Sequence, residues 1–207
     1  KEYIGKMKIH KDIPEEELKK EIKNFIGKIK QIPPRKSRVK REERERTVNK
    51  WEILEINGKI ASFRCDVEAG TYIRKLVSDL GEKIGGAHMI ELRRIRAGIF
   101  LEKDSYLINE IEKAFKEAKE GNEKNLRKIL IPAEDLIKKS FLCITVNEDS
   151  IRALLNGKPL MNEDLKDNLD LKENLFAVFD KDMKKFIGIY KKINQKNIIG
   201  LPEFILN

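Results

Sequence analysis

The order of apolar and polar residues predicts strands and helices that follow one another closely from the start of the chain. Residues 3–10 alternate as a strand with one buried face would, with Tyr3, Gly5, Met7 and Ile9 on one side. A helix is expected next, capped by Asp12 and ended by Gly27. The Asn57-Gly58 pair lies between two alternating runs and predicts a β-hairpin with a type I′ turn.

A second helix is expected over residues 71–84, followed by a strand over residues 88–100. The apolar residues of this helix recur at helical spacing and form one face: Ile73, Leu76, Val77, Leu80 and Ile84. Residues 107–130 predict two short helices broken at Gly121-Asn122. Since the strands come in hairpins and not in βαβ units, we predict an α+β fold with a mixed, mainly antiparallel sheet and flanking helices.

The last third of the chain has the pattern of a separate small domain. Residues 141–146 predict a strand, residues 147–157 a short helix, and residues 174–193 a hairpin around a polar turn. Short strands, one helix and turns with glycine are typical of a small β-barrel. We therefore expect one domain over residues 1–135 and a second over residues 136–207.

Composition narrows the class of protein. The 207 residues include 44 Lys or Arg against 35 Asp or Glu, a net charge of +9, and the mean hydropathy of −0.53 excludes a membrane protein. The net charge favours a polyanionic partner, although a protein from a hot habitat also carries many charges of both signs. Cys65 and Cys143 suit a reducing compartment, and counting alone leaves a disulfide between them open. With only two histidines beside them, a standard zinc site is not expected.

Residues 28–46 hold the most basic segment of the chain. Nine Lys or Arg stand there against three Glu, and Pro33 and Pro34 exclude a helix through the middle. An extended basic segment of this kind is typical of a contact to phosphates. The alternative is a solvated, charged loop.

The most informative motif is residues 70–98, GTYIRKLVSDLGEKIGGAHMIELRRIRAG. This segment resembles the signature of the TruB and dyskerin family of RNA pseudouridine synthases. Lys1-Glu2-Tyr3 and the segment from Ile32 to Lys40 resemble two further motifs of that family. The family's nucleophile is an aspartate in a G-H-x-G-T-L-D motif, which does not occur in these 207 residues. We therefore expect the chain to be the later part of such an enzyme, to hold part of an active site, and to be inactive in isolation.

The resemblance assigns three catalytic positions. It implies that Arg74 pairs with the missing aspartate, which a guanidinium orients better than an ammonium does. It implies that Tyr3 stacks on the flipped uracil and accepts the C5 proton, and that Leu92 walls the uracil pocket. The structural alternatives are an exposed surface arginine, a core tyrosine and a core leucine. Asp66 and Glu68 lie in no matching motif, which argues against either as the nucleophile.

The resemblance and the basic segment together predict contacts to RNA. The expected contacts are Arg35, Lys36, Ser37, Arg38, Lys40 and Arg41. Arg38 stands where the family usually has alanine. The family's reaction requires neither a metal nor an organic cofactor, and Gly70, Gly85 and Gly86 are expected to serve backbone geometry and not to cradle a phosphate.

Two further segments favour the guide-RNA branch of the family. Lys40-Arg41 with Arg44, Arg46 and Thr47 resembles a stretch of archaeal and eukaryotic dyskerin homologues, and residues 131–134 resemble the link into their PUA domain. The expected activity is RNA-guided conversion of uridine to pseudouridine in rRNA or tRNA within a box H/ACA ribonucleoprotein. The expected partners are guide RNA, substrate RNA, small protein subunits and a separate segment with the aspartate; the expected location is cytoplasmic, or nucleolar in a eukaryote. A stand-alone tRNA synthase and a non-catalytic RNA-binding fragment remain as alternatives.

Overall fold

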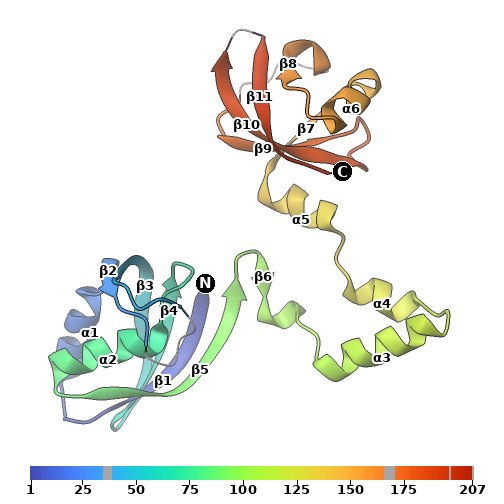
Figure 1. The fold of residues 1–207 in the computed structure, drawn as a ribbon. Helices are drawn as coiled ribbons and strands as arrows, with labels where there is room; N and C mark the ends of the chain where they lie inside the picture. Colours follow the sequence, from blue (N-terminus) through green and yellow to red (C-terminus); the bar gives the residue numbers. More distant parts are fainter. Residues whose placement is uncertain (35–38, 166–170, 196, 207) are drawn as a thin grey trace. The chain divides into compact units, whose positions relative to one another are not determined.

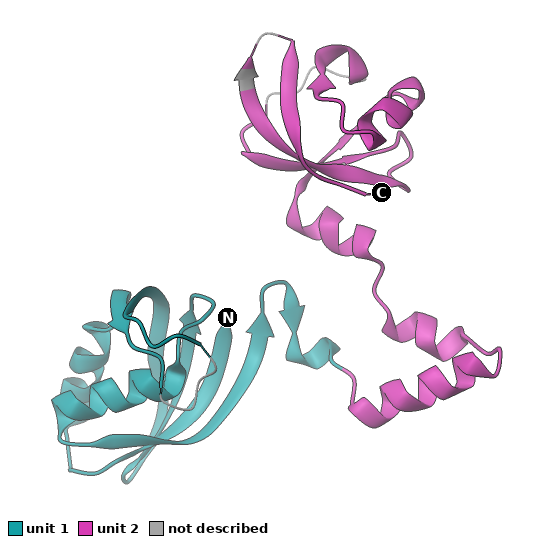
Figure 2. Ribbon diagram, viewed as in Figure 1, with its two compact units in different colours: residues 1–105 teal, residues 106–207 magenta. Residues whose placement is uncertain are grey.

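The computed structural model describes residues 1–34, 39–165, 171–195 and 197–206, and it divides into two compact units (Figures 1 and 2). The first unit ends at Ser105 and the second begins at Tyr106. The sequence places a domain boundary later, after residue 135, because the helices between the two points read as part of the first domain. That later boundary stays a prediction.

Unit 1 is built on a six-stranded sheet in which all neighbouring strands are antiparallel. The strand order is β2-β3-β4-β1-β5-β6. The strands are β1 (Glu2–Ile9), β2 (Gly27–Gln31), β3 (Arg44–Asn57), β4 (Ile60–Val67), β5 (Ala87–Ala97) and β6 (Phe100–Leu101). The helices are α1 (Glu15–Lys23), α2 (Ile73–Ile84) and the short 3₁₀ helix η1 (Glu102–Asp104). This arrangement confirms the predicted α+β class.

The core of unit 1 lies between the sheet and the two helices α1 and α2 (Figure 1). Met7 of β1 and Phe63 of β4 are fully buried, as are Leu18 of α1 and Leu76 and Leu80 of α2. Each face follows from the sequence, because residues two apart on a strand and three or four apart on a helix point the same way. Burial of this apolar surface contributes about 25 cal/mol per Å² to the stability of the unit.

Three local predictions in unit 1 were wrong. Gly27 does not end α1: the helix ends at Lys23 with Asn24 as its C-cap, and Gly27 is the first residue of β2. Asp12 does not cap α1; Pro14 precedes the first helical residue, because a proline disfavours helical geometry at Ile13 just before it. The turn between β3 and β4 is shifted by one residue from the Asn57-Gly58 pair. Asn57 pairs with Ile60, and in the turn only Gly58 has a positive φ, of 56°. A type I′ turn needs two such residues, so this turn has a different geometry.

In its described residues, unit 2 contains four α-helices, one short 3₁₀ helix and a five-stranded sheet of order β7-β9-β10-β11-β8 that forms half of a barrel. The helices are α3 (Ile108–Lys119), α4 (Lys124–Ile129) and α5 (Ala133–Ser140), followed later by α6 (Glu148–Leu155) and the 3₁₀ helix η2 (Asn162–Asp164). The strands are β7 (Leu142–Thr145), β8 (Leu160–Met161), β9 (Leu175–Phe179), β10 (Phe186–Gln195) and β11 (Ile198–Ile205). β7 and β9 are parallel and the other pairs are antiparallel, so the predicted small β-domain is present.

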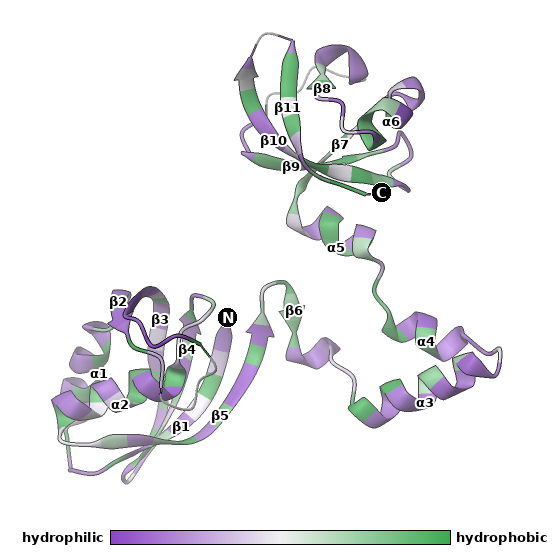
Figure 3. Cartoon of the chain, in the orientation of Figure 1, coloured by the Kyte–Doolittle hydropathy of each residue, from purple (hydrophilic) through white to green (hydrophobic). Residues whose placement is uncertain are grey.

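The helices of unit 2 differ in how they are packed. Both apolar and polar residues occur along α3 (Figure 3), yet Ala114 is its one buried residue. Leu107 and Ile108 at its start are 67% and 76% exposed. By contrast α6 buries Leu154 in the core of the β-domain, beside Tyr190. Among the described residues, no helix has the length and apolar character to span a membrane.

Candidate active site

The segment between β4 and α2 holds Arg74 in position. Gly70 has a φ of +90°, which favours glycine, and a Cβ added there would lie 3.0 Å from Nε of Arg46, so the arginine side chain would have to shift. Thr71 is buried, and Tyr72 takes an extended conformation as the last residue before the helix. Arg74 then falls in the first turn of α2, on the exposed side. The G-T-Y-I-R motif is therefore a turn at a glycine with positive φ, followed by a helix start.

A cavity of about 350 Å³ brings the three predicted catalytic residues together. They come from different elements, Tyr3 from β1, Arg74 from α2 and Leu92 from β5. The complete lining is Tyr3, Pro34, Thr71, Tyr72, Ile73, Arg74 and Leu92. The sequence places these residues far apart, and only the pairing of β1 with β5 beneath α2 brings them to one place.

Strand register puts Tyr3 and Leu92 on the same face of the sheet. Tyr3 pairs with Arg94 and Gly5 pairs with Leu92 across β1 and β5. Gly5 has no room for a side chain, since a Cβ there would lie 2.6 Å from the ring of Phe63. Both Tyr3 and Leu92 are partly buried and pack against the core of unit 1. Each side chain therefore both supports the core and lines the cavity.

Arg74 contributes a positive charge to the cavity. Its side chain is exposed, and it forms no ion pair with a carboxylate among the residues that the structure describes. The next residue, Lys75, is by contrast paired with Asp79 one turn later in α2. The guanidinium of Arg74 thus remains available to orient an anionic group that enters the cavity.

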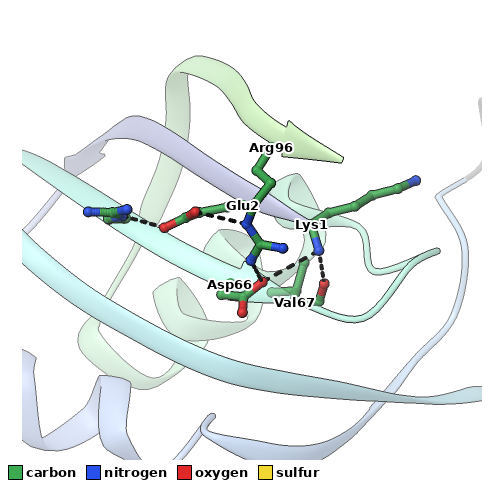
Figure 4. A network of polar contacts seen from close by, with 6 residues as sticks. Lys1, Glu2, Asp66, Val67 and Arg96 are labelled. Atoms are coloured by element: carbon green, nitrogen blue, oxygen red, sulfur yellow. Dashed lines mark hydrogen bonds and ion pairs between the residues drawn. The ribbon is translucent and has the colours of Figure 1, made fainter. Parts of the chain in front are cut away.

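Two carboxylates of the strands beside the cavity, Glu2 of β1 and Asp66 of β4, form hydrogen bonds with arginines other than Arg74 (Figure 4). Asp66 accepts a hydrogen bond from Nη2 of Arg96 at 3.0 Å, and Glu2 accepts one from Nε of the same arginine at 3.2 Å. Hydrogen bonding from Arg64, joined by that from Arg96, lowers the pKa of Glu2 despite its partial burial. Glu2 pairs with Asp66 while Tyr3 pairs with Cys65, so both carboxylates lie on the other face of the sheet.

Glu68, the third carboxylate near the motif, is also occupied. It accepts a hydrogen bond from the amide of Thr47 at 3.0 Å and lies 3.6 Å from Nη1 of Arg46. These contacts tie the segment before α2 to β3. They support the expectation that neither Asp66 nor Glu68 is a nucleophile.

The structure pairs three lysines of the basic segment with its three glutamates. Lys28 pairs with Glu45 and Lys30 with Glu43, each at 2.9 Å, and Lys40 pairs with Glu42. Lys40 and Arg41, two predicted contacts to RNA, are exposed. The other four, Arg35, Lys36, Ser37 and Arg38, lie outside the described residues.

Four lining residues were not predicted from the sequence: Pro34, Thr71, Tyr72 and Ile73. Thr71, Tyr72 and Ile73 directly precede Arg74, and Pro34 belongs to the Pro33-Pro34 pair of a family-like segment. These positions in the sequence were the only signal that could have indicated them. The hydroxyl of Thr71 is buried without a hydrogen-bond partner among the described residues.

Across all the residues that the structure describes, no cluster of three or more His, Cys, Asp or Glu could hold a metal ion. Both cysteines are free thiols, and burial, followed by the nearby Asp66, raises the pKa of Cys65 to about 12.

Comparison with known protein families identifies two adjoining domains. Residues 1–73 match the TruB family pseudouridylate synthase N-terminal domain, and residues 74–138 match the tRNA pseudouridylate synthase B C-terminal domain. Together the two matches span two thirds of the chain. Similar curated proteins include the probable tRNA pseudouridine synthase B of Nanoarchaeum equitans, at 40% identity over 162 residues, and that of Korarchaeum cryptofilum, at 42% over 162 residues.

These alignments cover 77% of this chain but only 46% and 50% of the two relatives, so the chain spans about half the length of the curated relatives that it matches. Solved structures match nearly all of it. A Cbf5-Nop10-Gar1 complex contains a chain with 30% identity and a TM-score of 0.79, over 99% of this chain and 66% of that one. An H/ACA ribonucleoprotein bound to a substrate RNA containing 2′-deoxyuridine gives 29% identity and a TM-score of 0.80, over 100% and 65%.

Proposed function

Because the chain belongs to the TruB family of pseudouridine synthases, we propose that it takes part in converting uridine to pseudouridine in RNA. The reaction breaks the N1–C1′ bond of a uridine, joins C1′ to C5 of the same base, and releases the proton from C5. The uracil must first leave its stack and enter a pocket. The observation that carries the proposal is the cavity lined by Tyr3, Arg74 and Leu92.

Each of the three residues has a role that its position supports. The guanidinium of Arg74 holds the family's nucleophilic aspartate, which is supplied by a segment other than these 207 residues. The ring of Tyr3 stacks on the flipped base, and its hydroxyl accepts the proton from C5. Leu92 closes the pocket with an apolar wall. The reaction as proposed uses neither a metal nor an organic cofactor.

We further propose that a guide RNA selects the uridine. Support comes from the solved structures, since chains from H/ACA complexes match both units of this protein at TM-scores of 0.75 to 0.80. In this scheme the β-domain is PUA-like and binds RNA, and small protein subunits complete the particle. The names of the curated relatives favour the second candidate, a tRNA synthase that acts without a guide.

Release of tritium from C5-labelled uridine in RNA tests both candidates. The 207-residue chain should bind structured RNA and release no tritium, whereas the chain joined to an aspartate-bearing segment should release it only with a matching guide. Guide-independent release from a tRNA would establish the stand-alone synthase. Release by the 207-residue chain alone would overturn the divided active site, and no release from the joined protein would leave only RNA binding.

A further inference from the structure

One buried side chain joins the basic segment to the start of α2. Gln31, the last residue of β2, is 3% exposed. Its Oε1 accepts a hydrogen bond from the amide of Tyr72 at 3.0 Å, and its Nε2 donates one to the carbonyl of Tyr72 at 3.4 Å. A primary amide thus satisfies both polar groups of one residue, as a neighbouring strand would.

We infer that Gln31 is a positioning residue for Arg74. Tyr72 immediately precedes the first residue of α2, and Arg74 lies two residues further on. No side chain of the described residues caps the amides inside the first turn. In a capping box the glutamate at the third helical position bonds the amide of the capping residue. Here Gln31 supplies that contact from 41 residues away in the sequence.

The same side chain connects two walls of the cavity. Pro34 follows Gln31 by three residues and lines the cavity. Tyr72 and Arg74 line the same cavity from a different segment of the chain. In the sheet β2 has one neighbouring strand, β3, so its other edge is not held by a strand of the described chain. The amide of Gln31 ties that edge to α2. Loss of the two hydrogen bonds would leave the amide of Tyr72 without its partner, whereas its carbonyl would keep the bond from the Leu76 amide at 3.0 Å. The start of α2 would then be free to shift.

The inference rests on the proposed function, because it concerns the arginine that holds the nucleophile. A displacement of about 1 Å at a catalytic group can lower the rate about 10²-fold. A fault in the position of Arg74 should therefore lower kcat and leave RNA binding nearly unchanged.

The decisive variants are Gln31→Met, which keeps the length but removes both hydrogen bonds, and Gln31→Glu. The matched control is Ile22→Val, which removes a methylene from the core of the same unit and leaves the two hydrogen bonds of Tyr72 with Gln31 in place. In the 207-residue chain, NMR should show faster hydrogen exchange at the Tyr72 amide and a shifted Nε resonance of Arg74 for Gln31→Met only. In the chain joined to the aspartate-bearing segment, Gln31→Met should lower kcat about 10–100-fold with little change in KM.

Gln31→Glu adds a signature that a loss of stability does not produce. A protonated glutamic acid accepts from the Tyr72 amide and donates to its carbonyl, as the amide does, whereas the carboxylate repels that carbonyl. The kcat of Gln31→Glu relative to the unmodified enzyme should therefore recover at low pH and fall as the carboxyl ionises. Burial raises the pKa of such a group, so the fall should occur above the ordinary range for glutamate.

Three results would overturn the inference. One is an unchanged Arg74 resonance in Gln31→Met, which decides the matter in the 207-residue chain whether or not the joined enzyme turns over. Another is an unchanged kcat in Gln31→Met while the unmodified enzyme is active. The third is an equal loss of kcat in Ile22→Val. If the unmodified joined enzyme is inactive, the proposed function fails separately.

Discussion

At the scale of single residues, Arg74 combines an exposed charge with a fixed backbone. Its helix start is held by Gly70 and by the hydrogen bonds between Gln31 and Tyr72, so little conformational freedom remains upstream of its side chain. An arginine whose only task was solubility would not require such support. The arrangement suits a guanidinium that must present two N–H groups to a carboxylate in one orientation.

Substitution of Arg74 should therefore affect chemistry more than binding. In the enzyme that carries the aspartate, Arg74→Ala should lower kcat about 10²–10³-fold, as expected when one preorganised electrostatic contact is lost. Arg74→Lys should restore little, because an ammonium cannot bind both carboxylate oxygens in a plane. Single-turnover kinetics and RNA affinity measured together check this, with Lys20→Ala as the control for loss of one positive charge. Turnover of Arg74→Lys at the unmodified rate would contradict the pairing.

The side chain of Tyr3 has two proposed functions, base stacking and proton acceptance, and two substitutions can separate them. Tyr3→Phe keeps the packing against the core and the stacking face but lacks the hydroxyl, so removal of the proton from C5 should slow about 10²–10⁴-fold if that hydroxyl accepts the proton. Tyr3→Ala should also weaken binding of the flipped base by about 1–3 kcal/mol. Single-turnover rates and thermal unfolding of both variants test this. A silent Phe variant with a destabilised Ala variant would assign Tyr3 to the core alone.

The residues of the cavity could be predicted only in part from the sequence. Tyr3, Arg74 and Leu92 were found because a motif surrounds each of them, and the structure brings all three to one cavity. Gln31 could not be found in this way, because its importance comes from two hydrogen bonds to a residue 41 positions later. Side-chain to main-chain contacts of that range leave no periodic signal.

At the scale of elements, α2 lies unusually close to β5. A Cβ added to Gly81 would lie 2.4 Å from the amide nitrogen of Ala87 and 3.0 Å from its carbonyl oxygen. The glycine of the D-L-G motif therefore permits close approach of a helix to the strand that carries Leu92. The position of Arg74 relative to Leu92 depends on this contact, so the motif serves the cavity through packing.

Gly81→Ala gives a test in which two effects have opposite signs. Alanine inside a helix is normally more stable than glycine by about 0.5–1 kcal/mol. Here the added methyl group overpacks the contact with Ala87, at a cost of about 1–3 kcal/mol, so the variant should be less stable. Denaturant unfolding measures the difference, and Ser78→Ala on the exposed side of α2 is the control without overpacking. A more stable Gly81→Ala would show that α2 can move away from β5 freely.

Helices and strands were more predictable than their ends. The periodicity in α2 and the alternation in β1 and β4 reflect burial on one face, which a sequence records directly. The start of α1 and the turn at Gly58 were missed because each depends on the φ of a single residue. Such a choice is made by local sterics and by the register of the flanking strands, not by a repeated pattern.

In the β-domain, Asp164 should make stability depend on pH. This carboxylate is 2% exposed, and burial alone would raise its pKa; hydrogen bonds from Ser150, from the Met161 amide and from Lys158 together lower it. A lowered folded-state pKa stabilises the fold above the unfolded value, and this contribution is lost as pH falls through the folded value. The melting temperature should thus fall below about pH 4. Asp164→Asn should remove this part of the pH dependence, whereas the exposed Asp149→Asn should retain it.

At the scale of the whole molecule, the number of Lys and Arg side chains, 44, overstates the number that are free to contact RNA. All three glutamates of residues 28–46 are in ion pairs with lysines of the same segment. These pairs are exposed, so each contributes little to stability. They instead occupy lysines that could otherwise contact phosphates. The ion pairs therefore limit how strongly the segment can bind RNA of any sequence.

Removal of one such glutamate should strengthen RNA binding. Glu43→Gln frees Lys30, which can then contact one more phosphate, and the slope of log K against log salt should steepen by about 0.7–0.9. The affinity gain should be largest at low salt and vanish at high salt, because it comes from released counterions. Glu17→Gln on α1 removes the same charge outside the segment and serves as the control. An equal gain in Glu17→Gln would mean that the total charge of the molecule, and not this segment, attracts the RNA.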